Sequence, residues 1–275
     1  MIFIGTSGIF GRYVPLDAIP AVWWRAAIGM LLLGAFCWWK GFSFRIDDPK
    51  RRRVVILSGF LMMGHWVGYF YALKLSSVAV GMLAIFTYPA MTTLLEPLLL
   101  KKPFEPRHLA LGILVVIGVF FLAPSFSLAD GATIGLLLGL LSALLYSLRN
   151  ILMKTQVDVL QGPVLMTYQA GITMLLLLPT LFYFDATPTA AALPYLIGLG
   201  LLTTAIGHTL LLACFRHFSI STASLLTCVQ PIYGILMGVV FFGEIPGWTA
   251  VLGGALILSA VIVEARATMG KTVPV

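Results

Sequence analysis

The chain repeats itself at an offset of 142 residues, within a sequence that is almost entirely apolar. Tyr88-Pro89 aligns with Gln230-Pro231, and Gly112 aligns with Gly254, with no net gap between the two copies. Internal duplication within a bundle of membrane spans is typical of transporters, in which two similar halves enclose a site near the bilayer midplane. The repeat therefore predicts two similar halves with a site between them.

Apolar segments that approach the length of a membrane helix recur along the whole chain. Hydrophobic residues make up 60% of the chain and charged residues 10%, with a mean hydropathy of +1.03, whereas a soluble domain carries about 25% charged residues. Nine such windows are present, and the segment before Arg12 is a tenth. The windows are Ala18–Trp39, Val54–Leu73, Val78–Leu100, His108–Ala123, Ile134–Met153, Pro163–Phe184, Tyr195–Phe215, Ala223–Phe242 and Trp248–Val263. Their apolar runs are continuous and not alternating, so we expect an all-α integral membrane protein with ten transmembrane helices.

The basic residues are divided unequally between the two sides of such a bundle. Counting alternate loops, one side holds thirteen of the 17 lysines and arginines, and the other holds only Arg12 and Lys74. Because cytoplasmic loops carry the excess of positive charge, we expect a multi-pass protein of the bacterial inner (plasma) membrane with both termini in the cytoplasm. We expect the basic loop run Lys50–Arg53 to contact anionic lipid headgroups of the bilayer, and we expect no nucleic-acid partner.

Five spans per half is an odd number, so the second half must enter the membrane from the opposite side, as an inverted repeat. The predicted division is 1–123 for the first five-helix repeat, 131–265 for the second, and 266–275 for a cytoplasmic tail. Met1–Gly11 covers only about 16 Å, about half of the hydrocarbon core. We therefore expect the first helix to be truncated, with a genuine half-helix as the alternative.

Several short motifs are similar to those of a known family. They are Phe3-Ile4-Gly5-Thr6-Ser7, Trp24-Arg25-Ala26, Tyr88-Pro89, Gln230-Pro231, and Phe242-Gly243-Glu244 followed by Gly253-Gly254. With these motifs the chain resembles the drug/metabolite transporter superfamily, of the ten-span EamA type, over both halves. The family pattern of a glycine–glutamate at the end of the fourth span is met at Gly243-Glu244, but Lys101-Lys102 replaces it in the first half. The resemblance implies a secondary transporter that exports or takes up small metabolites such as amino acids. Of the two directions we expect export, by alternating access around a central cavity.

Two other functional classes are kept as alternatives, an intramembrane enzyme and a channel-like pore. An intramembrane enzyme would need paired aspartates or a serine–histidine pair within the spans, but every aspartate lies in a loop or at a span end. A channel would need a selectivity filter or a ring of charge, and nothing in the sequence resembles either. We therefore expect no enzymatic activity and no cofactor.

His65 is the sharpest candidate for the site, because a polar side chain near the middle of a span costs free energy and usually serves function. Met62 and Tyr69 share its helix face by spacing, which predicts an aromatic wall with a neutral, hydrogen-bonding histidine. The alternative is a structural histidine bonded to a neighbouring helix. His208 lies near the repeat equivalent of His65, at an offset of 143. Two histidines lack the further ligands of a metal site, so we expect no metal.

Two arginines also lie within spans. Arg149, beside Asn150 in the sixth span, can hold a substrate carboxylate bidentately, or it can pair with helix carbonyls or lipid headgroups. Arg25 lies nearer the outer end of the second span, where we expect a structural or interfacial role.

The predicted cavity is lined by spans one, three, four, six, eight and nine. Tyr88 and Gln230 precede the mid-span prolines, which break the helices locally, and are expected to face the site. The candidates for substrate binding share mid-span depth and a polar or aromatic side chain: Thr6, His65, Trp66, Tyr69, Tyr88, Tyr146, Arg149, Asn150, His208 and Gln230. Besides the small-molecule substrate and the bilayer, a coupling proton and a homodimer are left open as partners.

Overall fold

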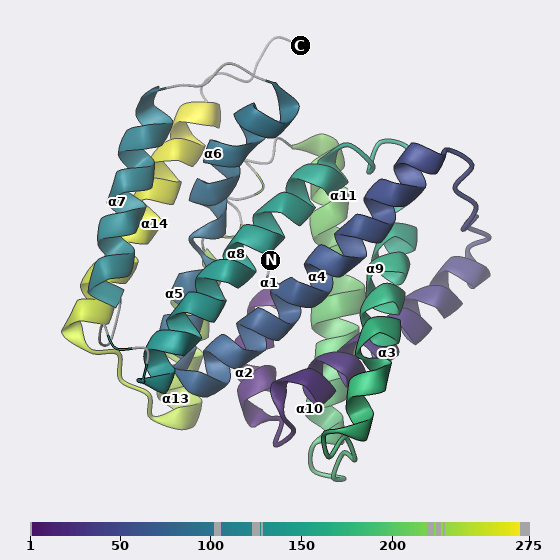
Figure 1. The fold of residues 1–275 in the computed structure, drawn as a ribbon, viewed down its shortest axis with the longest axis horizontal. Coiled ribbons are helices and arrows are strands. Elements are labelled where there is room, and N and C mark those ends of the chain that lie inside the picture. Colours follow the sequence, from purple (N-terminus) through teal and green to yellow (C-terminus); the bar gives the residue numbers. More distant parts are fainter. Residues whose placement is uncertain are drawn as a thin grey trace.

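The computed structural model describes residues 2–101, 106–122, 127, 129–218, 223, 227 and 229–269, which form helices joined by short connections (Figure 1). No strand occurs in this part of the chain. The prediction of an all-α protein is therefore confirmed for the described residues. The physical reason is that the bilayer interior offers no water to the backbone N–H and C=O groups. An α-helix satisfies these groups by hydrogen bonds within the same segment.

Six helical segments are long and apolar enough to cross a membrane. They are α3 (Ala18–Trp39), α4 (Pro49–Leu75), α5 with α6 (Val78–Ile85 and Tyr88–Leu100), α8 (Gly131–Lys154), α9 with η1 (Gly162–Leu177 and Leu178–Phe182), and α10, η2 and α11 in succession (Leu193–Gly198, Leu199–His208 and Thr209–His217). Shorter apolar stretches lie in α7 (Pro106–Leu122), α13 (Val229–Phe242) and α14 (Trp248–Met269), and the chain begins with α1 (Ile2–Gly5) and α2 (Ser7–Tyr13). The chain is a multi-pass membrane protein by the length and composition of these helices.

Aspartates fix where several helices begin. Asp48 accepts a hydrogen bond from the backbone N–H of Lys50 at 2.8 Å, so α4 starts at Pro49. The basic run Lys50–Arg53, which the sequence placed in a loop, therefore forms the first turn of this helix. Asp130 caps α8 in the same way, through the N–H of Ala132 at 3.0 Å. Such caps satisfy N–H groups that have no partner within the helix.

Three helical segments are interrupted near the middle of the molecule. Pro89 has no N–H to donate to the preceding turn, and the backbone breaks just before it, between α5 and α6. A second break falls at Thr6, between α1 and α2, where the Thr6 hydroxyl donates to the Phe3 carbonyl at 2.8 Å. The third interruption is the π-helix η2, which ends at His208.

Close contacts between helices rely on glycine. The helices α7 and α14 lie side by side (Figure 1), and a Cβ atom added to Gly253 would lie 2.5 Å from the carbonyl oxygen of Gly118. The helices α4 and α8 approach in the same way, because a Cβ on Gly68 would lie 3.0 Å from the carbonyl oxygen of Leu138. Small residues that let backbones approach are the usual basis of helix packing in membranes.

Basic side chains tie helices together at the two ends of α8. At its Gly131 end, which we call the Arg12 end, Arg12 donates to the carbonyl of Leu73 at 2.8 Å and pairs with Glu244 at 3.2 Å. Glu244 also accepts from the backbone N–H of Val78 at 2.7 Å.

The opposite end of α8, which we call the Lys154 end, has similar contacts. Lys154 donates to the carbonyl of Phe215, and Arg216 donates to the carbonyl of Val157 at 2.6 Å. Both ends therefore hold basic side chains on backbone carbonyls of a neighbouring segment.

Candidate functional site

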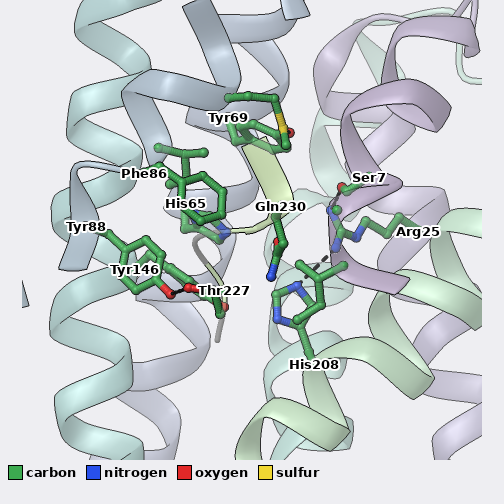
Figure 2. A pocket seen from close by; sticks show the side chains of 14 residues that line it. Ser7, Arg25, His65, Tyr69, Phe86, Tyr88, Tyr146, His208, Thr227 and Gln230 are labelled. Carbon is green, nitrogen blue, oxygen red and sulfur yellow. Dashed lines mark hydrogen bonds between the residues drawn. The ribbon is translucent and has the colours of Figure 1, made fainter. Parts of the chain in front are cut away.

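A cavity lies where the first two short helices meet α3, α4, α5, α8, η2 and α13 (Figure 2). About 470 Å³ of space there is free of protein atoms, part of which is continuous with the surroundings. The lining consists of Ile4, Gly5, Ser7, Arg25, His65, Tyr69, Met82, Ile85, Phe86, Tyr88, Tyr146, His208, Thr227 and Gln230. A mostly apolar cavity with a few convergent polar groups is typical of a small-molecule site.

The structure brings six of the ten sequence candidates to this cavity. They are His65, Tyr69, Tyr88, Tyr146, His208 and Gln230. The other four, Thr6, Trp66, Arg149 and Asn150, do not contribute to the lining. Trp66 is fully buried and lies directly behind the cavity, with its ring against the Arg25 guanidinium at 4.3 Å.

The Arg149 guanidinium is held by protein groups away from the cavity. Its Nε and Nη2 atoms donate to the side-chain oxygen of Gln169 at 3.0 and 2.6 Å, and Nη1 donates to that of Asn150 at 2.9 Å. Nη2 also approaches the sulfur of Met166 at 3.1 Å. Arg149 and Asn150 therefore form a polar cluster between α8 and α9, and the structure gives no contact of Arg149 with a helix carbonyl.

One side of the cavity is an aromatic wall. His65 and Tyr146 stack with their ring centres 4.2 Å apart, and Tyr88 meets the Tyr146 ring edge-on at 4.9 Å. Tyr69 lies parallel to His65 at 6.3 Å and donates its hydroxyl to the sulfur of Met82 at 2.8 Å. Figure 2 shows these rings facing the polar groups of the opposite side.

The hydrogen bonds of His65 fix its tautomer. The hydroxyl of Ser142 donates to the carbonyl of His65 itself at 2.7 Å, and its oxygen lies 2.8 Å from Nδ1 of the same histidine. Because a hydroxyl has only one proton, that oxygen must accept from Nδ1–H. Nε2 is then an acceptor that receives no hydrogen bond from any residue the structure describes. His65 therefore both joins α4 to α8 and offers an acceptor on the cavity lining.

Arg25 faces the aromatic wall from the other side of the cavity, and it was not among the sequence candidates for the site. As expected, it lies nearer the Ala18 end of its helix, but the structure buries it within the bundle, with 1% of its surface exposed, and not at an interface with lipid or water. Nε donates to the hydroxyl of Thr204 at 2.8 Å, Nη1 to that of Ser7 at 3.1 Å, and Nη2 contacts Nε2 of His208 at 3.2 Å (Figure 2). The sequence did contain a signal for this burial. Arg25 lies on the same face of α3 as the small residues Ala21 and Gly29, and small residues are typical of the helix face that packs against other helices.

The remaining lining residues were also missed. Ser7 entered the sequence analysis only as the last residue of the motif Phe3-Ile4-Gly5-Thr6-Ser7. Met82, Ile85 and Phe86 are apolar residues that nothing in the sequence distinguishes from lipid-facing ones. Thr227 lies 2.6 Å from the Tyr88 hydroxyl, so a hydrogen bond joins two lining residues that are far apart in the chain.

The π-helix η2 positions the polar groups of the second half. It carries Thr204 and ends at His208, and both of these side chains contact Arg25. A π-helix is rare and most often occurs at functional sites. Among the described residues, no group of three or more histidine, cysteine, aspartate or glutamate side chains is placed to hold a metal.

The arrangement defines a membrane protein with a central cavity of the kind that binds small molecules, and comparison with known proteins identifies its family. Residues 1–123 and 133–264 match the EamA-like transporter family. The chain belongs to this family, within the drug/metabolite transporter superfamily.

Relatives match over nearly the whole chain. An uncharacterized transporter of Archaeoglobus fulgidus is 26% identical over 267 residues, which cover 96% of this chain and 93% of that protein. The pseudopaline exporter CntI of Pseudomonas aeruginosa is 23% identical over 256 residues, covering 93% and 88%. A solved crystal structure superposes with a TM-score of 0.70 at 19% identity, covering 98% of each chain, and therefore has the same fold.

Proposed function

We propose that the chain is a secondary transporter that exports small metabolites, such as amino acids, by alternating access around this cavity. One observation carries the proposal: the cavity is enclosed jointly by residues from both segments that match the transporter family, such as Arg25 and His65 from the first and Tyr146 and His208 from the second. A site shared by two similar units is opened to one side or the other when the units rock against each other. The exporter CntI among the relatives supports the direction of transport.

We further propose that the fold consists of ten transmembrane helices in two inverted five-helix repeats, residues 1–123 and 131–265, followed by a tail at 266–275. The contacts at the two ends of α8 support this. Arg12 donates to the carbonyl of Leu73, and Lys154 donates to that of Phe215. The second pair stands 142 residues after the first, as the repeat requires, and lies at the opposite end of the bundle.

In this proposal the protein lies in the bacterial inner membrane with both termini in the cytoplasm, and the Arg12 end faces away from the cytoplasm. Cysteine labelling tests the orientation, in a variant whose native cysteines are replaced. Asp130→Cys should react in intact cells with an impermeant maleimide, and Arg52→Cys should react only after the cells are opened. The reverse pattern would refute the orientation.

Counterflow tests the transport mechanism. Purified protein is reconstituted into liposomes that are loaded with an unlabelled amino acid, and uptake of the labelled amino acid is measured over a panel of such substrates. A carrier should show uptake that saturates and is stimulated by substrate inside, whereas protein-free liposomes should show neither. Uptake that does not saturate and ignores the inside concentration would instead favour the channel, and chemical conversion of the substrate would favour the enzyme.

A further inference from the structure

Arg25 is a buried cation without an acidic partner. The ion pairs among the described residues join Arg12 to Glu244, Arg45 to Asp47 and Arg51 to Asp48, and none includes Arg25. Removing a charged group from water is unfavourable unless it is paired. The Trp66 ring at 4.3 Å offsets only part of that cost, because a cation–π contact does not replace the lost hydration of the whole guanidinium.

The guanidinium also has hydrogen-bonding capacity to spare. It carries five N–H groups, and its hydrogen bonds to described residues engage one on Nε with Thr204, one on Nη1 with Ser7 and one on Nη2 with His208. One N–H remains on each of the two terminal nitrogens. A carboxylate accepts from that pair of nitrogens in the bidentate geometry that arginine favours.

His208 adds a third unused donor beside Arg25. Because a guanidinium can only donate, Nε2 of His208 must accept, which places the proton of the neutral ring on Nδ1. Nδ1 is buried and has no hydrogen-bond partner. A buried donor without a partner costs free energy that a suitable ligand would recover.

Arg149 provides the contrast within the same molecule. It is equally buried, but Gln169, Asn150 and Met166 surround its guanidinium, and it does not line the cavity. The difference between the two arginines is therefore the empty space in front of Arg25.

We propose that Arg25 and His208 form a carboxylate-binding subsite within the cavity, and that the ligand is a small carboxylate with an apolar or aromatic body. The body would lie against the aromatic wall formed by Tyr69, Tyr88 and Tyr146 (Figure 2). The lining residues that the structure describes include one cationic side chain and no acidic one, so they disfavour an organic cation of the same shape. The inference rests on the proposed function, since it takes this cavity to be the substrate site.

The test compares acids with their neutral amides. Binding of 3-phenylpropionate, 3-methylbutanoate, their amides and 3-phenylpropylamine to the purified full chain is measured by thermal unfolding in chloride-free buffer, since a ligand of the folded state raises its stability. We expect the acids to bind at least tenfold more tightly than the amides, and the amine to bind most weakly. Arg25→Gln should bring the acid-to-amide ratio close to one, and Arg25→Lys should retain part of it.

Arg149→Gln is the matched control, because it removes a buried guanidinium that does not line the cavity, and it should leave the acid-to-amide ratio unchanged. His208→Ala should weaken the acids more than the amides. If Arg25→Gln does not fold, the comparison of wild type with Arg25→Lys still decides, because the ratio must fall in the lysine variant.

Four outcomes would overturn the subsite. They are equal binding of acid and amide to the wild type, no binding of either acid, an unchanged ratio in both Arg25 variants, and stabilisation by chloride as large as that by the acids. Counterflow separates this proposal from the proposed function. Acid-selective binding without counterflow of any acid would refute the proposed transport function and support the subsite. Counterflow restricted to amines would support the transport function and refute the subsite.

Discussion

Gly253→Ala should destabilise the protein, because the added methyl group meets backbone that cannot move aside. Its Cβ would lie 2.5 Å from the carbonyl oxygen of Gly118 and 3.1 Å from the backbone nitrogen of Leu122. Both atoms belong to α7, so relief requires the two helices to separate. Overpacking of this kind costs about 1–3 kcal/mol, and we expect the upper half of that range because neither contact is with a side chain that could rotate.

Gly34→Ala is the matched control, since it makes the same change within α3 where a Cβ would meet nothing within 4 Å. Replacing a helical glycine by alanine at an open position is favourable by about 0.5–1 kcal/mol. Gly253 also lies within a helix, so both variants share this gain, and they should differ in the free energy of unfolding by the overpacking cost alone, about 2–3 kcal/mol. Reversible unfolding in mixed detergent micelles measures this difference, and ligand affinity should stay unchanged because neither α7 nor α14 lines the cavity. Equal stability of the two variants would refute the packing argument.

Two further predictions concern the polar groups. Glu244→Gln should lower the free energy of unfolding by about 1 kcal/mol or less, because the ion pair with Arg12 is partly exposed. The difference from wild type should shrink in high salt, since salt screens exposed charges. A difference that salt leaves unchanged would show that the loss of charge is not its cause. His65→Ala should weaken transport while folded protein remains in the membrane, measured by counterflow beside quantification of the folded fraction. Wild-type rate and affinity in this variant would assign His65 the structural role that its bond to Ser142 also supports.

The helices were the most predictable part of the molecule, because in a membrane segment length and apolarity nearly determine helix formation. The window predicted at Ala18–Trp39 is α3, residue for residue. Pro89 also revealed where the span containing it breaks. The break at Thr6 and the π-helix η2 could not be read in this way, because their residues are ordinary for a membrane helix and only contacts with neighbours favour the irregular backbone.

The candidate site was only partly predictable. Mid-span depth and polarity led to His65 and His208, which line the cavity. The same criteria selected Arg149 and not Arg25, although Arg25 lines the cavity and Arg149 does not. The direction of a side chain depends on how its helix rotates and tilts against others, which depth and polarity do not reveal. The Arg149 guanidinium donates two hydrogen bonds to the side chain of Gln169, whereas the Arg25 guanidinium faces the cavity.

The contacts at the two ends of α8 differ in one respect that bears on the resting state of the protein. Arg12 has an acidic partner in Glu244, which belongs to another part of the bundle. At the Lys154 end, the ion pairs among the described residues are short-range, between Arg45 and Asp47 and between Arg51 and Asp48. The residue that precedes Glu244 by the repeat offset of 142 is Lys102, a base instead of an acid.

The unequal ion pairing at the two ends has a thermodynamic consequence if the proposed alternation between two openings is correct. If opening the Arg12 end breaks the pair with Glu244, an interaction worth about 1 kcal/mol raises the ratio of closed to open molecules at that end about fivefold. The bias depends on ionic strength on the side of the membrane that the Arg12 end faces, because salt screens partly exposed charges. In the proposed orientation, the external salt concentration would thus shift the fraction of molecules whose cavity is directed toward the Lys154 end.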